Sequence, residues 1–193
     1  MEKRLEKPLR TAVNFLESHS YRYAIIGGIA LTQWGVLRIT LDVEIKVLVP
    51  EMDYGAVRKV LEGVFSQRAR IQAPVTPLIV SVEIDEITVD FLLALPGYEE
   101  FIIERAVRRD LGGWSAWFCS AEDLIIQKIV AGRGKDLSDV EMLLIEQHGK
   151  LDEAYIESWL NQFVAALEKP EILQEYSEIV ERVKKLSGWN ADK

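Results

Sequence analysis

The chain has 193 residues, 49% of them hydrophobic and 28% charged, which allows one sizeable domain or two small ones with a buried core. The formal net charge of −8 and the pI near 5.0 argue against a broad, sequence-independent DNA-binding surface, although metal ions and a few local cations can still meet the charge of a nucleotide. The single cysteine, Cys119, permits no internal disulfide and indicates a reducing compartment.

The N-terminus and the apolar runs predict a soluble protein of the cytoplasm. Residues 1–4 lead into an amphipathic pattern and not into an apolar signal segment. No uninterrupted apolar run approaches the roughly 18 residues that are needed to span a bilayer. We therefore expect a cytoplasmic localisation and no membrane partner.

The first part of the chain alternates between helical and strand patterns. Leu5, Leu9, Val13 and Leu16 recur at helical spacing, so the chain is expected to begin with an amphipathic helix. The elements predicted next are a buried strand over 23–26, a turn at Gly27-Gly28, a short helix over 29–34, a half-buried strand over 41–47 and a helix over 53–65.

The rest of the chain changes from strand to helical patterns. Residues 78–84 and 87–93 are strand-like and are separated only by Asp85-Glu86, which predicts a hairpin. The other predicted elements are a loop over 73–77, helices over 99–109, 121–131, 137–148, 153–167 and 170–186, and a further strand over 114–118.

These elements predict an α/β (α+β) fold with a small, mixed, twisted sheet flanked by helices and a helical C-terminal half. The periodicity changes near Pro96-Gly97. We therefore expect an α/β core over residues 1–97 and a mostly helical region over residues 98–193 that packs on it.

Three carboxylates point to a metal site. Asp42 and Glu44 alternate along one strand, so their side chains point the same way about 6–7 Å apart. Asp90 lies in an otherwise apolar strand, where a charged group needs a reason. Such oxygen ligands suit magnesium, and two ions would orient a nucleophile and steady a leaving pyrophosphate. The alternative is that these acids simply mark solvent-facing strand positions.

The glycine pair between the first predicted strand and helix points to phosphate binding. Gly27 and Gly28 leave backbone N–H groups accessible next to a helix N-terminus. The spacings of the dinucleotide fingerprint and of the P-loop are both absent. Arg38 and Thr40 lie between this turn and the acids, and Arg38 can either steady phosphate oxygens or pair with Asp42.

Two blocks of the sequence resemble a known superfamily. The run Ile26-Gly27-Gly28 followed, after a spacer, by Asp42-Val43-Glu44-Ile45 resembles the defining motif of the polymerase-β-type nucleotidyltransferases. A second block, over 120–128 and 132–140, is similar to the helical motifs of small prokaryotic nucleotidyltransferase-like proteins, including those of abortive-infection, type IV toxin–antitoxin systems. The resemblance covers roughly residues 20–145.

The resemblance implies a magnesium-dependent enzyme that moves a nucleoside monophosphate from an NTP to an acceptor hydroxyl of RNA or protein. It also implies a toxin-like role and an antitoxin-type protein partner. The implied catalytic and metal-binding residues are Asp42, Glu44 and Asp90, in a two-metal site. The implied nucleotide-binding residues are Gly27, Gly28, Arg38, Thr40, Lys128, Arg133, Lys135 and Asp136.

Several residues allow other interpretations. Lys128 and Lys135 can be solvated helix-face lysines, and Asp136 can cap a helix N-terminus, as can Asp139. Lys46 follows Glu44 on the same face, where it can repel a cation or pair with that carboxylate. Departures of this kind leave room for a non-catalytic module that has kept the fold and binds a protein partner.

Overall fold

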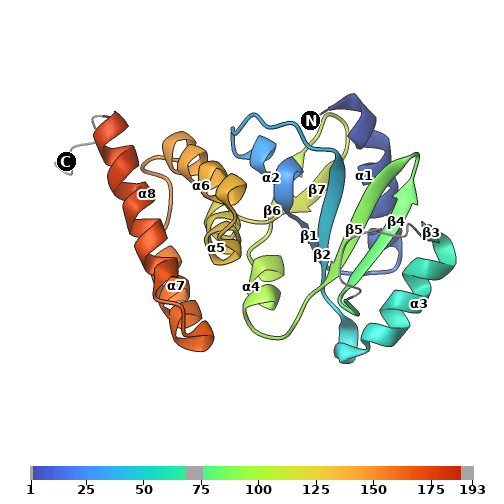
Figure 1. Ribbon diagram of the computed structural model, residues 1–193. Helices are drawn as coiled ribbons and strands as arrows, with labels where there is room; N and C mark the ends of the chain where they lie inside the picture. The colour runs from blue at the N-terminus through green and yellow to red at the C-terminus, as the bar shows by residue number, and fades with distance from the viewer. Residues whose placement is uncertain (1, 68–75, 188–193) are drawn as a thin grey trace. The chain divides into compact units, whose positions relative to one another are not determined.

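The computed structural model describes residues 2–67 and 76–187, and the chain divides into two compact units (Figure 1). The units consist of Met1–Ala30 with Arg38–Ser120 (unit 1), and of Leu31–Leu37 with Ala121–Lys193 (unit 2).

Unit 1 holds all the strands of the described residues together with the helices of the N-terminal part. Its elements, in chain order, are α1 (Lys3–Ser18), β1 (Tyr23–Ile25), α2 (Gly27–Gln33, which ends in unit 2), β2 (Asp42–Val47), the 3-10 helix η1 (Pro50–Met52), α3 (Tyr54–Val64), β3 (Ser66–Gln67), β4 (Ile79–Ile84), β5 (Ile87–Leu93), α4 (Tyr98–Glu104), β6 (Val107–Asp110) and β7 (Ser115–Phe118).

The strands of the described residues form one seven-stranded sheet in the order β3-β4-β5-β2-β1-β7-β6. The pairs β2·β5 and β1·β7 are parallel, whereas β1·β2, β3·β4, β4·β5 and β6·β7 are antiparallel. The predicted fold class, a mixed sheet flanked by helices and followed by a helical half, is confirmed.

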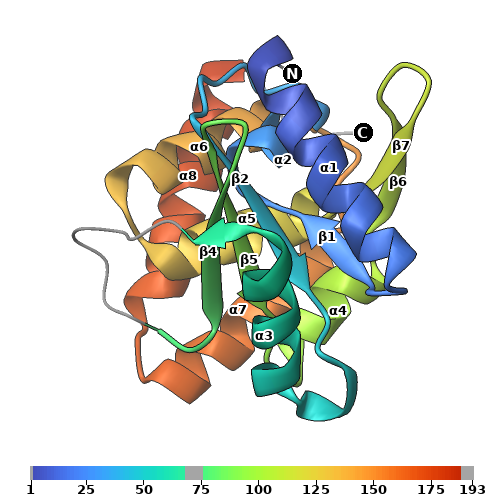
Figure 2. The same cartoon turned by 90° about the vertical axis from the view of Figure 1, so that its right-hand side faces the viewer.

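One face of this sheet forms the core of unit 1. Val43 and Ile45 of β2 and Phe91 of β5 are fully buried, and α1 and α3 lie against this face (Figure 2). The rings of Phe15 and Phe91 each contact Phe65, with centroids 5.0 and 5.9 Å apart. The residues that alternate with this apolar set therefore point to the opposite face.

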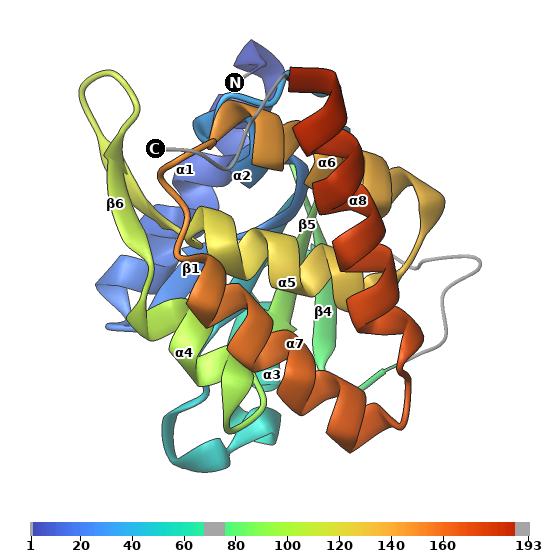
Figure 3. The ribbon, with the colours of Figure 1, turned by 90° about the vertical axis from the view of Figure 1, so that its left-hand side faces the viewer.

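Unit 2 is helical. Besides the end of α2, its elements are α5 (Ala121–Ala131), α6 (Gly134–Glu146), α7 (Glu153–Leu167) and α8 (Glu171–Ser187), and Figure 3 shows α8 turning back from the end of α7. The carboxylate of Asp152 accepts a hydrogen bond from the backbone N–H of Tyr155 (2.9 Å) and so caps α7. No helix in the described ranges is long and apolar enough to cross a bilayer.

The structure corrects one predicted helix. The helix expected over 99–109 ends at Glu104, and 107–110 forms strand β6, which pairs with the strand predicted over 114–118. Gly112 and Gly113 have φ of 84° and 92° and allow the tight connection between the two strands. This pairing outweighs the local helical pattern, so 98–118 lies within unit 1.

The predicted glycine turn and the predicted loop over 73–77 also differ from, or lie outside, what the structure describes. Gly27 and Gly28 form the first turn of α2 and not a separate turn before it. The loop predicted over 73–77 falls mostly outside the described residues, because only its last two positions are described.

The β4–β5 turn offers a test of the predicted hairpin. Asp85 and Glu86 both have positive φ, 49° and 66°, which costs about 1 kcal/mol or more for a residue with a side chain. Replacing Glu86 with glycine should therefore raise the free energy of unfolding by up to about 1 kcal/mol in urea titrations. Glu83→Gly, inside β4, is the control and should lower it. A loss of stability in Glu86→Gly would contradict the turn geometry.

Candidate functional site

Strands β2 and β5 bring the three predicted acids to one face of unit 1. In the parallel register Glu44 lies opposite Asp90, on strands about 4.8 Å apart. Asp42 begins β2, two residues before Glu44, and so points to the same face. Asp90 is 3% exposed, and the other two acids are half-buried. The alternative that all three simply mark solvent-facing positions is therefore wrong for Asp90.

Hydroxyl groups contact two of these carboxylates. The Asp90 carboxylate accepts a hydrogen bond from the Ser81 hydroxyl (2.6 Å), and Ser81 lies opposite Asp90 in the β4–β5 register. The Asp42 carboxylate accepts one from the Thr40 hydroxyl (3.2 Å). These contacts orient both acids within unit 1.

The two glycines allow the start of α2 to approach this face closely. A Cβ on Gly27 would lie 1.7 Å from Oε2 of Glu44, and Gly27 also has a φ of +65°. A Cβ on Gly28 would lie 2.6 Å from the Thr40 hydroxyl oxygen. A side chain at either position would displace the group that faces it. Six of the predicted site residues thus gather in unit 1: Gly27, Gly28, Thr40, Asp42, Glu44 and Asp90.

Arg38 belongs to the same segment of unit 1, where it is half-buried. Two interactions are predicted for Arg38, contact with phosphate oxygens and an ion pair with Asp42, and both stay predictions.

The acids fit a magnesium ion by the chemistry of their donor atoms. Carboxylate oxygens on one face, with room left for waters and phosphates, are what magnesium prefers. Within the residues that the structure describes, no three histidine, cysteine, aspartate or glutamate side chains converge as a ready-made metal-binding group. Asp42, Glu44 and Asp90 therefore share a face without meeting at one point.

Lys46 does not pair with Glu44. Its side chain is 5% exposed and forms an ion pair with Glu99 of α4. The other carboxylate oxygen of Glu99 accepts a hydrogen bond from the backbone N–H of Leu95 (2.7 Å). The ammonium group of Lys46 is thus directed toward α4.

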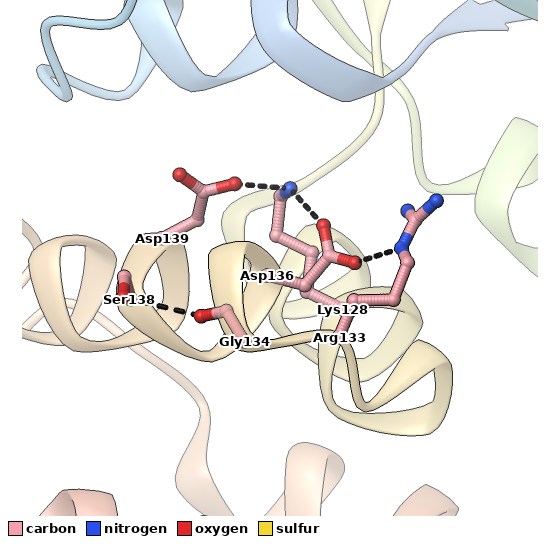
Figure 4. Close-up of polar contacts among 6 residues, drawn as sticks. All are labelled: Lys128, Arg133, Gly134, Asp136, Ser138 and Asp139. Carbon is pink, nitrogen blue, oxygen red and sulfur yellow. Dashed lines mark hydrogen bonds and ion pairs between the residues drawn. The ribbon is translucent and has the colours of Figure 1, made fainter.

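In unit 2, four of the other predicted residues, Lys128, Arg133, Lys135 and Asp136, belong to α5, α6 and the link between them. Figure 4 shows the contacts of Lys128, Arg133 and Asp136. The Lys128 ammonium donates hydrogen bonds to Asp136 (3.1 Å) and Asp139 (2.6 Å). Arg133 forms an ion pair with the second oxygen of Asp136. Lys128 is 8% exposed, so the prediction of a solvated lysine is wrong there, whereas Lys135 is exposed.

The ion pairs of this cluster control the charge of Asp136. Burial alone would raise the pKa of its carboxyl group, but hydrogen bonds from Arg133 and Lys128, together with their positive charges, lower the pKa below its ordinary value. The side chain of Asp136, in the first turn of α6, thus pairs with Lys128 of α5 and with Arg133, which precedes α6.

Comparison with known proteins decides the family. The sequence pattern of a family described as "Nucleotidyltransferase of unknown function (DUF6036)" matches residues 5–184. The chain belongs to this nucleotidyltransferase family. The superfamily predicted from the glycine pair and the strand acids is thereby confirmed, and the abortive-infection, toxin–antitoxin type stays a prediction. No curated protein matches this family member.

Solved structures resemble this nucleotidyltransferase family member in fold. An antigenic nucleotidyltransferase-like protein from Paracoccidioides brasiliensis is 16% identical over 90% of this chain and 92% of its own, with a TM-score of 0.53. ANT(2″)-Ia, solved in complex with adenylyl-2″-tobramycin, is 14% identical over 91% and 97%, with a TM-score of 0.46. The first likeness supports the fold, and no argument rests on the second.

Two residues of the site were not found from the sequence. Ser81 could have been, because a two-residue turn at Asp85-Glu86 places it opposite Asp90 by counting back along the hairpin. Glu99 gives no such signal, since it is 53 residues from Lys46 and contacts it only through the fold.

The Lys46–Glu99 pair can be tested by its effect on stability. Glu99→Gln leaves a buried ammonium without its counter-charge, so we expect a loss of about 1–3 kcal/mol in the free energy of unfolding. The double variant Lys46→Met/Glu99→Gln removes both charges and should recover most of that loss. Equal stability of wild type and Glu99→Gln in denaturant titrations would contradict the buried pairing.

The cluster in unit 2 predicts a pH-dependent stability. A lowered folded-state pKa means that Asp136 contributes stability above its unfolded pKa of about 3.9 and loses it as the pH falls through the lower folded value. Asp136→Asn should therefore cost about 1.5–3 kcal/mol at neutral pH, and this cost should shrink below pH ~4. Chemical unfolding across pH measures it. The exposed control Lys135→Met should change stability by less than about 0.5 kcal/mol at every pH, and a pH-independent cost for Asp136→Asn would contradict the assignment.

Proposed function

We propose that this family member is a magnesium-dependent nucleotidyltransferase that moves a nucleoside monophosphate from an NTP to an acceptor hydroxyl of RNA or protein. The observation that carries the proposal is the β2–β5 register, which places Glu44 opposite Asp90 with Asp42 on the same face. This face lies next to the two glycines that begin α2. A toxin-like role with an antitoxin-type partner is supported only by the sequence motifs.

In the proposed reaction the acceptor oxygen attacks the α-phosphorus of the NTP. The bond between that phosphorus and the oxygen bridging to the β-phosphate breaks, and pyrophosphate leaves. Asp90 accepts the hydroxyl proton, a role supported by the hydrogen bond that it already accepts from the Ser81 hydroxyl (2.6 Å). Asp42 and Glu44 would hold magnesium, which offsets the charge of the phosphates in a one- or two-ion site.

The glycines and their neighbours would receive the triphosphate. Gly27 and Gly28 lack the side chains that would cover the backbone at the start of α2, and Thr40 lies against this turn. In unit 2, Lys128 pairs with Asp136 and Asp139, and Arg133 pairs with Asp136, and these residues carry no part of the proposal. Their predicted contact with nucleotide, like that of Lys135, rests on the motif resemblance.

A second candidate is a non-catalytic module that binds a protein partner. The supporting observation is the exposure of two apolar side chains of unit 1 in the segment that leads into β2. Ile39 and Leu41 are 79% and 66% exposed, and exposed apolar surface can mark an interaction site. Nucleotide binding separates the two candidates.

The proposed function is tested by the thermal stability of the protein with each NTP, with and without magnesium. A ligand present at 100 times its dissociation constant adds about 2.7 kcal/mol to the folded state. We expect a magnesium-dependent rise in Tm for wild type and none for Asp42→Asn/Glu44→Gln. The matched control Glu6→Gln/Glu86→Gln removes two exposed charges elsewhere in unit 1 and should respond like wild type.

Two results of this thermal-stability experiment would contradict the proposed function or its metal ligands. An unchanged magnesium–NTP response in Asp42→Asn/Glu44→Gln would overturn the assignment of these carboxylates. The absence of any shift in wild type would favour the partner-binding module.

A further inference from the structure

A cavity of about 240 Å³ lies in unit 1, away from the three acids. Its volume is that of about eight waters in the liquid, at roughly 30 Å³ each. Tyr23, at the start of β1, lines it, and β1 pairs antiparallel with β2 so that Tyr23 lies opposite Val47. Asp42, at the other end of β2, is therefore about 16 Å away along the strand at 3.3 Å per residue.

Two carboxylates at the ends of helices line this cavity. Glu17 lies in the last turn of α1, and Glu104 is the last residue of α4. A helix C-terminus carries a partial negative charge that favours cations, yet neither last turn contains a basic residue. Glu104 forms no ion pair with any residue that the structure describes. Glu17 and Glu104 thus bring two carboxylates to the lining of the cavity.

Aromatic side chains form the remaining walls. Tyr21 and Trp117 line the cavity, and the Trp117 residue is 40% exposed. The guanidinium carbon of Arg108 lies 6.0 Å from the centre of the Trp117 ring, so an ammonium ligand would replace Arg108 at this ring or contact another part of it. Ile103 adds a buried apolar wall that can contact a hydrocarbon chain.

A buried hydroxyl fixes one of the carboxylates. The Tyr23 hydroxyl donates a hydrogen bond to Glu17 (3.1 Å). Burial, followed by the charge of Glu17, raises the pKa of Tyr23, so the phenol keeps its proton. Only one cationic side chain, Arg22, is among the residues that line the cavity. It is exposed and can pair with an anionic group attached to the ligand.

We propose that this cavity binds an organic cation that carries a primary ammonium group, through Glu17, Glu104 and the ring of Trp117. The same chemistry is present in a free diamine and in the lysine side chain of a peptide. Both have an ammonium group for the carboxylates and a methylene chain for the aromatic walls. The site is separate from the proposed nucleotide chemistry and does not depend on it.

The test is a titration of the tryptophan fluorescence of the full-length protein without nucleotide. The probes are diaminobutane, N-acetyl-lysine methylamide and, as the uncharged analogue, butanediol. We expect a saturable change with at least one amine and none with butanediol. Glu17→Gln/Glu104→Gln should weaken binding by about tenfold or more, because two charge-assisted hydrogen bonds are lost. The charge-matched control Glu6→Gln/Glu86→Gln should bind like wild type.

A second variant separates the optical signal from binding. Trp117→Phe should lose most of the fluorescence change, while calorimetry still detects the amine, more weakly. Binding of the lysine derivative alone would assign the site to a peptide side chain, and binding of the diamine would assign it to a free amine. The proposal is overturned by equal binding of butanediol, by wild-type affinity in Glu17→Gln/Glu104→Gln, or by the absence of saturation with both amines.

Discussion

The parallel pairing of β2 with β5 is the interaction on which the candidate site depends. One register fixes both faces of the sheet, because successive side chains of a strand point to opposite sides. A slip by one residue would move Val43 and Ile45 out of the core and turn Glu44 toward α1 and α3. The burial of the apolar set, at about 25 cal/mol per Å², therefore also holds the carboxylates in register.

The same register brings three carboxylates to the polar face of the sheet. Asp42, Glu44 and Asp90 lie there, and the one lysine of β2 is paired with Glu99. Neighbouring hydroxyl groups orient two of these carboxylates without neutralising them. Like charges on adjacent strands repel one another, and a bound cation would offset that repulsion. Carboxylates gathered in this way match the metal–phosphate ligand of the proposed function.

Local patterns were sufficient to predict much of this arrangement. The alternation around Asp42, the hairpin at Asp85-Glu86 and the four C-terminal helices are encoded within short windows of sequence, and the structure has them. Long-range pairing was not predictable in this way. The strand over 107–110 carries a helical pattern and becomes β6 only because β7 is beside it. The pairing of Lys46 with Glu99 likewise depends on where α4 comes to lie.

The structure gives different physical explanations for the two sequence motifs, the glycine pair with the β2 acids in unit 1 and the charged cluster of α5 and α6 in unit 2. In unit 1, Gly27 and Glu44 meet closely, so the motif describes a place where backbone and carboxylate approach each other. In unit 2, Lys128 is enclosed by Asp136 and Asp139, and removing one member of such a buried set leaves an uncompensated charge. Selection for folding alone can therefore maintain the second motif. Loss of activity in a Lys128 variant would not distinguish a ligand contact from a loss of stability, whereas the half-buried acids of β2 can be exchanged for amides with less risk to the fold.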